Sequence, residues 1–220
     1  MLRRDFSLRL AAGTVAGAVT GAASSLAQAQ AAKGFQDGTD FITLEKRAPT
    51  EAPAGKIEVV EFFWYSCSHC NAFEPALEAW IKKAPKDVAV RRVPIAFQPN
   101  FEAQQRLYYA LEAMGKLDSL HAKVFYTIHV EKQPINTFAA ISAWIEKQGV
   151  DKAKFDAMFN SFSVATKARK ATQLQNEYKI DGVPSLGIAG RYLTSGSLTQ
   201  TMERALQVTD YLISDARKNK

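Results

Sequence analysis

Cysteine, histidine and long apolar stretches are all scarce in this chain of 220 residues, and each scarcity narrows what the protein can be. A closed structural zinc site needs four ligands, and a chain with only two cysteines and three histidines has almost no candidates for them. Beyond the first 29 residues, no apolar run approaches the length of a transmembrane helix. The net charge is only +6 and the cations are scattered, which argues against a nucleic-acid-binding protein.

The two cysteines, Cys67 and Cys70, have just two residues between them. A disulfide between such close positions closes a very short loop, so the stabilisation expected from the crosslink is small. Covalent haem attachment would need a histidine directly after the second cysteine, and position 71 is Asn. The spacing therefore favours a reactive pair of thiols over a structural disulfide, with two ordinary core cysteines as the alternative.

The residues around the pair strengthen that interpretation. Residues 57–65 are β-branched and aromatic, as in a buried strand, and residues 71–83 carry apolar side chains at helical spacing. Cys67 is then expected at the amino end of a helix, where free backbone N–H groups and the helix dipole stabilise a thiolate. A protonated His69 would add to this effect. Cys70 is expected to be more buried and able to attack a mixed disulfide formed at Cys67.

The first 29 residues have the pattern of an export signal, with a basic start, a mildly apolar centre and an Ala-Gln-Ala cleavage site. The run Arg3-Arg4-Asp5-Phe6 resembles a twin-arginine motif, and a general secretory leader with two arginines is an equal alternative. Either route delivers the mature protein to an oxidising compartment, where a disulfide persists. The periplasm is the expected location.

The rest of the chain predicts an α/β protein with an all-helical insertion. Further strands are expected at residues 41–44, 88–95, 185–189 and 191–193. Residues 101–170 show helical stripes that are interrupted at Gly115, Pro134 and Gly149, and the chain ends in an amphipathic helix. His121 and His129 fall in the helical stretch and are interpreted as surface or helix-packing residues.

Two other positions are candidates for the reactive site. Val183-Pro184 immediately precedes a predicted strand, and together with the upstream cysteines it suggests a cis proline facing the disulfide. Such a proline would leave the Val183 backbone free to pair with an extended substrate chain. Glu61 interrupts the apolar strand before the cysteines, and it is expected to lie either on a solvated face, which is the commoner case, or buried beneath the active site.

Together these residues resemble the DsbA family of thiol:disulfide oxidoreductases, within the thioredoxin superfamily. The segments that carry the resemblance are Glu61-Phe62-Phe63, Cys67-Ser68-His69-Cys70 and Gly182-Val183-Pro184, with the helical stretch between them. The resemblance implies a thioredoxin fold at residues 30–100 and 171–220, interrupted by a helical domain at 101–170. It also implies a role for each site residue: Cys67 is the exposed nucleophile, Cys70 the buried resolving thiol, His69 the thiolate-stabilising residue, Pro184 the cis proline and Glu61 the buried acid.

The resemblance implies an oxidase that donates its disulfide to newly exported polypeptides and needs no bound cofactor or metal. A membrane quinone-linked partner of the DsbB type would reoxidise it, and we expect a monomer. Val183 and Ser68 are expected to contact substrate. The best-known members have Pro where this chain has Ser68, and this position bears on oxidising strength because the residues between the cysteines tune thiolate stability.

Two other functions fit parts of the sequence. A disulfide reductase or isomerase could use the same fold, although isomerases usually add a dimerisation domain. A periplasmic metal carrier could bind copper or zinc through Cys67, Cys70 and His69, although no segment rich in Met or His accompanies them.

Overall fold

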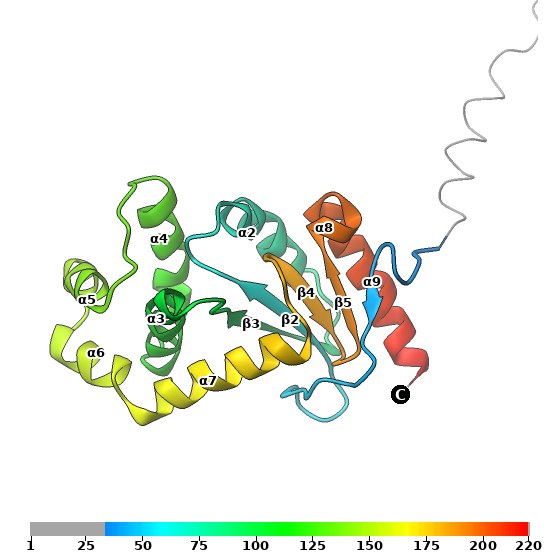
Figure 1. Cartoon of the computed structure of the whole chain (residues 1–220), viewed down its shortest axis with the longest axis horizontal. Coiled ribbons are helices and arrows are strands. Elements are labelled where there is room, and N and C mark those ends of the chain that lie inside the picture. Colours follow the sequence, from blue (N-terminus) through cyan, green and yellow to red (C-terminus); the bar gives the residue numbers. More distant parts are fainter. Residues whose placement is uncertain (1–33, 220) are drawn as a thin grey trace, which may run out of the picture. The chain divides into compact units, whose positions relative to one another are not determined.

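The computed structural model describes residues 34–219, and the chain from Phe35 onward forms one compact unit (Figure 1). The export signal expected at residues 1–29 lies outside the described residues. Among the described residues, no helix is both long enough and apolar enough to cross a bilayer.

A five-stranded mixed sheet forms the centre of this unit, in the order β1-β5-β4-β2-β3. The strands are β1 (Ile42–Thr43), β2 (Ile57–Phe63), β3 (Val88–Pro94), β4 (Ser185–Ile188) and β5 (Tyr192–Ser195). Strands β2 and β3 are parallel, and the other neighbouring pairs are antiparallel. All of the strands predicted from the sequence are confirmed, with ends that differ by one or two residues.

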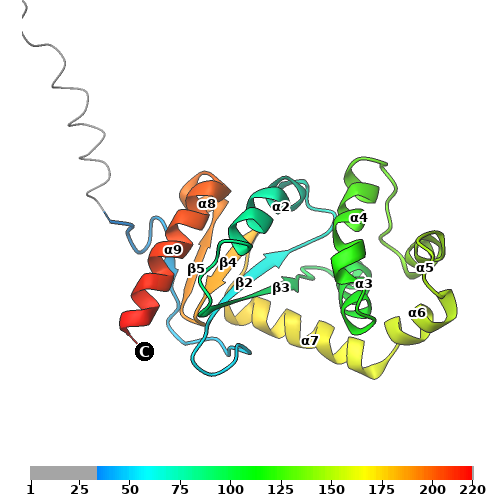
Figure 2. The ribbon, with the colours of Figure 1, turned by 180° about the vertical axis from the view of Figure 1, so that it is seen from behind.

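Strand β2 is buried along its whole length because helices cover both faces of the sheet (Figures 1 and 2). Its side chains alternate between two cores, as the pleat of a strand requires. Ile57 and Val59 pack with α2 (Ser68–Ile81) and α9 (Met202–Lys218), whereas Val60 and Phe62 pack with α7 (Phe162–Glu177). A strand covered on both faces needs apolar residues at most positions, and β2 has them at every position except Glu58 and Glu61.

The helical insertion follows β3 and returns to β4. It consists of a short 3-10 helix, η1 (Pro99–Phe101), then α3 (Glu102–Ala113), α4 (Leu117–His129), α5 (Phe138–Lys147), α6 (Lys152–Phe159) and α7. The predicted breaks at Gly115, Pro134 and Gly149 all fall between helices. The expected domain boundary at residue 170 falls inside α7, which runs continuously from the insertion to the sheet.

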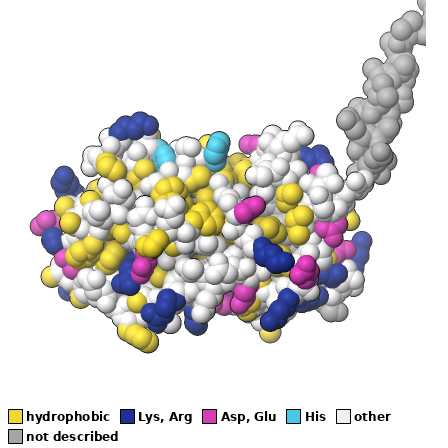
Figure 3. All heavy atoms as spheres, in the orientation of Figure 1, with side chains coloured by type: hydrophobic (Ala, Val, Ile, Leu, Met, Phe, Trp, Pro, Cys, Tyr) yellow, Lys and Arg dark blue, Asp and Glu magenta, His cyan; other side chains and the backbone are white. Residues whose placement is uncertain are grey.

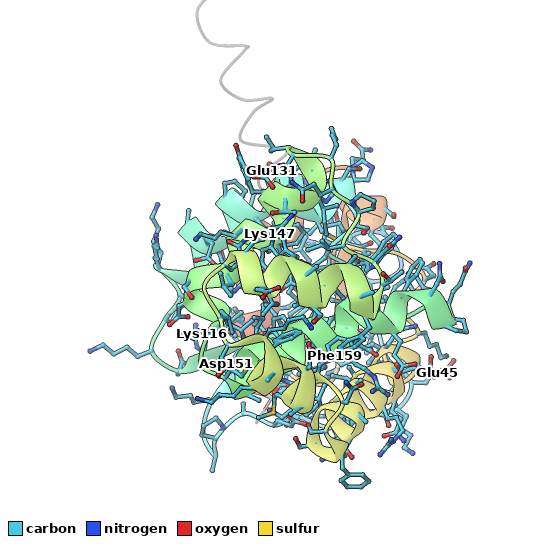
Figure 4. The ribbon with its side chains drawn as sticks, turned by 90° about the vertical axis from the view of Figure 1, so that its left-hand side faces the viewer. Glu45, Lys116, Glu131, Lys147, Asp151 and Phe159 are labelled. Carbon is cyan, nitrogen blue, oxygen red and sulfur yellow. The ribbon has the colours of Figure 1, made fainter. Side chains whose placement is uncertain are left out.

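The apolar side chains of the insertion pack into the same core as Val60 and Phe62 of β2, and its outer surface is charged. Figure 4 looks onto its far end, where Lys116, Glu131, Lys147 and Asp151 are exposed around the buried ring of Phe159. Asp151 is also the N-cap residue of α6, where its carboxylate accepts a hydrogen bond from the backbone N–H of Lys154.

The register of the sheet brings distant segments together at one edge. Phe62, near the end of β2, is paired with Ser185, the first residue of β4. The residues that follow β2 and those that precede β4 therefore meet there, although they are more than a hundred positions apart in the chain. Helix α8 (Gly196–Thr199) lies beyond β5 at the same edge (Figure 1).

Candidate active site

Cys67 is the N-cap residue of α2, in extended backbone conformation. Its Sγ accepts a hydrogen bond from the backbone N–H of Cys70 at 3.4 Å, which satisfies one of the free donors at the start of the helix. Cys67 is half-buried, whereas Cys70 is fully buried, and both are free thiols in this structure. The prediction that the first cysteine caps the helix and the second lies deeper is confirmed.

The surroundings of Cys67 favour its thiolate and lower its pKa to about 6. The largest contribution is a hydrogen bond from the Cys70 thiol, followed by backbone N–H groups of Cys70 and His69 and the charge of His69, with partial burial acting in the opposite direction. Burial raises the pKa of Cys70 well above its usual range. The pair therefore combines one thiol that ionises readily with one that does not.

The peptide bond between Val183 and Pro184 is cis, as predicted. The Cys67 thiol donates a hydrogen bond to the Val183 carbonyl at 3.4 Å, so the two segments are in direct contact. A cleft of about 430 Å³ opens beside them, and its lining includes His69, Phe73, Val183, Pro184 and Met202. Figure 3 shows two histidine side chains visible at the surface over α4 and α2, with hydrophobic side chains beside them.

Glu61 lies on the α2 side of β2 and is fully buried, as the resemblance implies, rather than on a solvated face. Its Oε2 accepts a hydrogen bond from Arg92 Nε at 3.0 Å. Its Oε1 has no hydrogen-bond partner among residues 34–219. Burial, reinforced by the nearby charge of Glu74, outweighs the effect of Arg92 and raises the pKa of Glu61 to about 8.

Arg92 connects Glu61 to the active-site helix. Its NH2 group lies 2.6 Å from a carboxylate oxygen of Glu78 and 3.3 Å from one of Glu74, both on α2. Three carboxylates around a single guanidinium raise the pKa of Arg92, although its burial acts in the opposite direction. Glu74 also lies 3.4 Å from His121 Nε2, so the cluster extends to the helical insertion.

The structure brings most of the predicted site residues together. His69, Val183 and Pro184 line the cleft, Cys67 adjoins it through its hydrogen bond to Val183, and Cys70 lies behind Cys67. Ser68 is the first residue of α2 and is exposed. Within the described part of the chain, no cluster of three or more Cys, His, Asp or Glu side chains has an arrangement that could hold a metal ion.

Sequence patterns did not assign three further polar residues to the site. His121 and His129 of α4 both form hydrogen bonds to Tyr65, and Gln104 of α3 forms one to Ser66. The expectation that the histidines pack between helices is right for the buried His121. The only sequence signal is their spacing, because residues eight apart lie about 80° apart around a helix and so on neighbouring sides of it.

Comparisons with known proteins agree with this geometry. The family model described as a DSBA-like thioredoxin domain matches residues 58–207. The thiol:disulfide interchange protein DsbA of Bordetella pertussis is 44% identical over 205 residues, covering 93% of this chain and 96% of the relative. The protein of the same name from Burkholderia cepacia is 40% identical over 200 residues, covering 91% and 94%.

Solved structures show the same similarity. The crystal structure of Pseudomonas aeruginosa DsbA matches with a TM-score of 0.80 and 35% identity, covering 84% of this chain and 96% of that one. The crystal structure of reduced DsbA1 from Neisseria meningitidis matches with a TM-score of 0.73 and 26% identity, covering 84% of this chain and 97% of that one.

Proposed function

The chain belongs to the DsbA-like thioredoxin family of thiol:disulfide oxidoreductases, and we propose that it is a dithiol oxidase that donates a Cys67–Cys70 disulfide to exported polypeptides. The observation that carries the proposal is the contrast between the two thiols. Cys67 is half-exposed at a helix N-terminus with its pKa lowered to about 6, whereas Cys70 is buried with its pKa raised. Stabilising the Cys67 thiolate stabilises the reduced protein and therefore makes its disulfide oxidising.

In the first step, a substrate thiolate attacks the Cys67 sulfur of the oxidised protein. A substrate–Cys67 disulfide forms, the Cys67–Cys70 bond breaks, and its electron pair leaves on Cys70. A buried thiolate at Cys70 is unfavourable, so it must take up a proton. Glu61 is suited to supply that proton, because its pKa near 8 leaves it largely protonated at neutral pH and its Oε1 is unpaired within residues 34–219.

In the second step, another thiolate of the substrate attacks the substrate sulfur of the mixed disulfide. Cys67 leaves as a thiolate, so the substrate gains one disulfide and the protein holds two thiols. The low pKa of Cys67 makes it a good leaving group. His69 supports this step because its charge favours the thiolate.

The cleft beside Cys67 supports a role in holding the substrate backbone. Val183 presents its carbonyl to the Cys67 thiol and lines the cleft, where an extended peptide could pair with it by strand addition. Pro184 has no N–H of its own to compete for that pairing. Ser68 is exposed beside Cys67, in a position to contact the bound chain.

The wider setting follows from the family and the sequence. Reduced, newly exported polypeptides are the proposed substrates in the periplasm, and a membrane quinone-linked DsbB-type protein is the proposed reoxidant. The protein acts as a monomer in this proposal, with residues 101–170 as the helical insertion between the two parts of the thioredoxin fold.

The redox equilibrium of the Cys67–Cys70 pair in glutathione buffers tests the proposal. A strongly oxidising pair and rapid oxidation of a reduced model protein are expected, and Cys67→Ser should abolish that activity. The exposed substitution Lys123→Ala on α4 serves as a control and should leave both properties unchanged. A potential near that of thioredoxin, with slow dithiol oxidation, would contradict the proposal and favour a disulfide reductase.

A further inference from the structure

Both histidines of α4 form hydrogen bonds to the same residue, Tyr65. The Tyr65 hydroxyl lies 2.8 Å from His121 Nδ1, and the Tyr65 backbone carbonyl lies 2.8 Å from His129 Nε2. Tyr65 belongs to the short segment 64–66, which joins β2 to Cys67. One helix of the insertion therefore holds both the side chain and the backbone of a residue two positions before the nucleophile.

The other two residues of segment 64–66 also contact the insertion. Gln104, a buried residue of α3, donates a hydrogen bond from Nε2 to Ser66 Oγ at 2.8 Å, and the same amide nitrogen lies 3.0 Å from the Ile135 carbonyl. The Trp64 ring stacks on Phe101 with 3.8 Å between ring centroids. Every residue of the segment thus has a partner in the insertion.

The chemistry of the partners fixes which imidazole nitrogens carry hydrogen. A carbonyl oxygen only accepts, so His129 Nε2 is the donor to Tyr65. The Glu74 carboxylate likewise only accepts, so His121 carries hydrogen on Nε2 and its Nδ1 receives the hydroxyl hydrogen of Tyr65 when the ring is neutral. Tyr65 is 1% exposed and its bond to His121 is buried, so that bond does not compete with bulk water.

Segment 64–66 is bonded directly to the nucleophile. The backbone N–H of Cys67 donates to the Trp64 carbonyl at 3.0 Å. The Cys67 sulfur accepts a hydrogen bond from the Cys70 N–H at 3.4 Å, and this bond persists in the thiolate, whereas the 3.4 Å bond to the Val183 carbonyl needs the protonated thiol as donor. Because the strength of a hydrogen bond depends steeply on its geometry, a small movement of this segment would change how well the thiolate is stabilised.

We propose that His121, His129 and Gln104 are positioning residues through which the helical insertion sets the redox equilibrium of the Cys67–Cys70 pair. They touch neither the sulfurs nor the cleft, and they act through Tyr65 and Ser66. The insertion is then part of the redox site rather than only a cover for it. This inference rests on the proposed dithiol oxidase function.

The sharpest test compares His129→Ala with His129→Gln, because the glutamine amide nitrogen can replace Nε2 as the donor to the Tyr65 carbonyl. The glutathione equilibrium constant is measured by acid quenching and thiol alkylation, and the Cys67 pKa by the ultraviolet absorbance of the thiolate. We expect the alanine variant to be about fivefold less oxidising, as the loss of one ordinary hydrogen bond predicts. Its Cys67 pKa should rise, and the glutamine variant should recover most of both losses.

Tyr65→Phe provides a second test if His129→Ala does not fold, because it removes only the hydroxyl that pairs with His121. It should also shift the equilibrium constant toward a less oxidising value. An alanine variant with the wild-type constant, or a glutamine variant no better than alanine, would overturn the inference. So would a wild-type constant in Tyr65→Phe when His129→Ala is unfolded. If the wild-type protein is itself not oxidising, the proposed function fails instead, so the two failures are distinguishable.

Discussion

The buried carboxyl of Glu61 connects stability to pH. Its pKa is raised from 4.5 to about 8 in the folded protein, so the folded state holds a proton that the unfolded state has already released over this range. The free energy of unfolding therefore falls as pH rises from the unfolded-state pKa of 4.5 to the folded-state pKa of about 8. Above about pH 8 the whole of this loss is present. Arg92 limits this cost but does not remove it.

We expect Glu61→Gln to stabilise the protein at alkaline pH. Glutamine has nearly the same shape and carries no charge to bury, and Arg92 keeps Glu74 and Glu78 as partners. The gain in unfolding free energy should be about 2 kcal/mol at alkaline pH, by analogy with removing an unfavourable buried charge, and should shrink as pH falls toward about 5. Urea unfolding at several pH values measures it, and a difference that does not vary with pH would contradict this assignment.

The Cys70 thiol makes the largest contribution to the low pKa of Cys67. Cys70→Ala should therefore raise the pKa of Cys67 from about 6 toward its ordinary value, whereas Cys70→Ser, which keeps a hydrogen-bond donor, should raise it less. The ultraviolet absorbance of the thiolate across a pH titration measures both variants. Equal pKa values in the two variants would mean that the backbone N–H groups, rather than the thiol, hold the charge.

The residues that perform the chemistry could be predicted from the sequence, but the residues that position them could not. Cys67, Glu61 and Pro184 are each marked locally, by a spacing, an acid in an apolar run and a proline before a strand. His121 and Gln104 carry no comparable mark, because their partners depend on how α3 and α4 pack against a segment at least 38 positions earlier. Arg92 was likewise not predicted as the partner of Glu61, since that pairing follows from the register of β2 with β3.

At the scale of elements, the packing of β4 against the residue that follows α7 requires a glycine at position 187. A Cβ placed on Gly187 would lie 2.6 Å from Cζ of Tyr178, whose buried ring also packs against Phe62. Gly187→Ala should therefore destabilise the protein by about 2 kcal/mol, as overpacking of a core commonly does. Thermal unfolding measures the loss, and adding Tyr178→Leu should recover part of it. A neutral Gly187→Ala would mean that the Tyr178 ring moves aside at little cost.

Strand and helix positions follow closely from periodicity, because β2 is covered on both faces and the insertion helices each bury one stripe. The hydrophobic pattern does not mark the predicted end of the insertion at residue 170, since α7 continues with helical periodicity from the insertion to the sheet. The buried side of α7 belongs to one core that joins the insertion to the sheet, so the sequence gives no local signal of where the insertion ends.

At the scale of the whole molecule, the Cys67 thiolate makes the stability of the reduced protein depend on pH. Its pKa is depressed from 9.0 to about 6, so the reduced folded state gains stability as pH rises between these values and loses it as pH falls through the folded one. The oxidised protein has no such thiolate. We expect the reduced form to melt a few degrees higher relative to the oxidised form at about pH 8 than at about pH 5.

Circular dichroism melts of both redox forms at the two pH values measure this difference. The Cys67→Ser variant supplies the control, because it should melt without the additional pH dependence. A melting difference between reduced and oxidised protein that stays constant with pH would contradict the role given to the Cys67 thiolate.

The order of strands in the sheet has a consequence for biosynthesis. Strands β4 and β5 are made last, yet they lie between β1 and β2, which are made first. Until residues 183–188 have left the ribosome, β2 lacks β4 as a neighbour and Cys67 lacks the Val183 carbonyl, which comes 116 residues later. An incomplete chain therefore exposes both an unpaired strand edge and a thiol without its partner segment. A protein proposed to supply disulfides to newly exported polypeptides is itself in need of protection from wrong pairing while its own chain is incomplete.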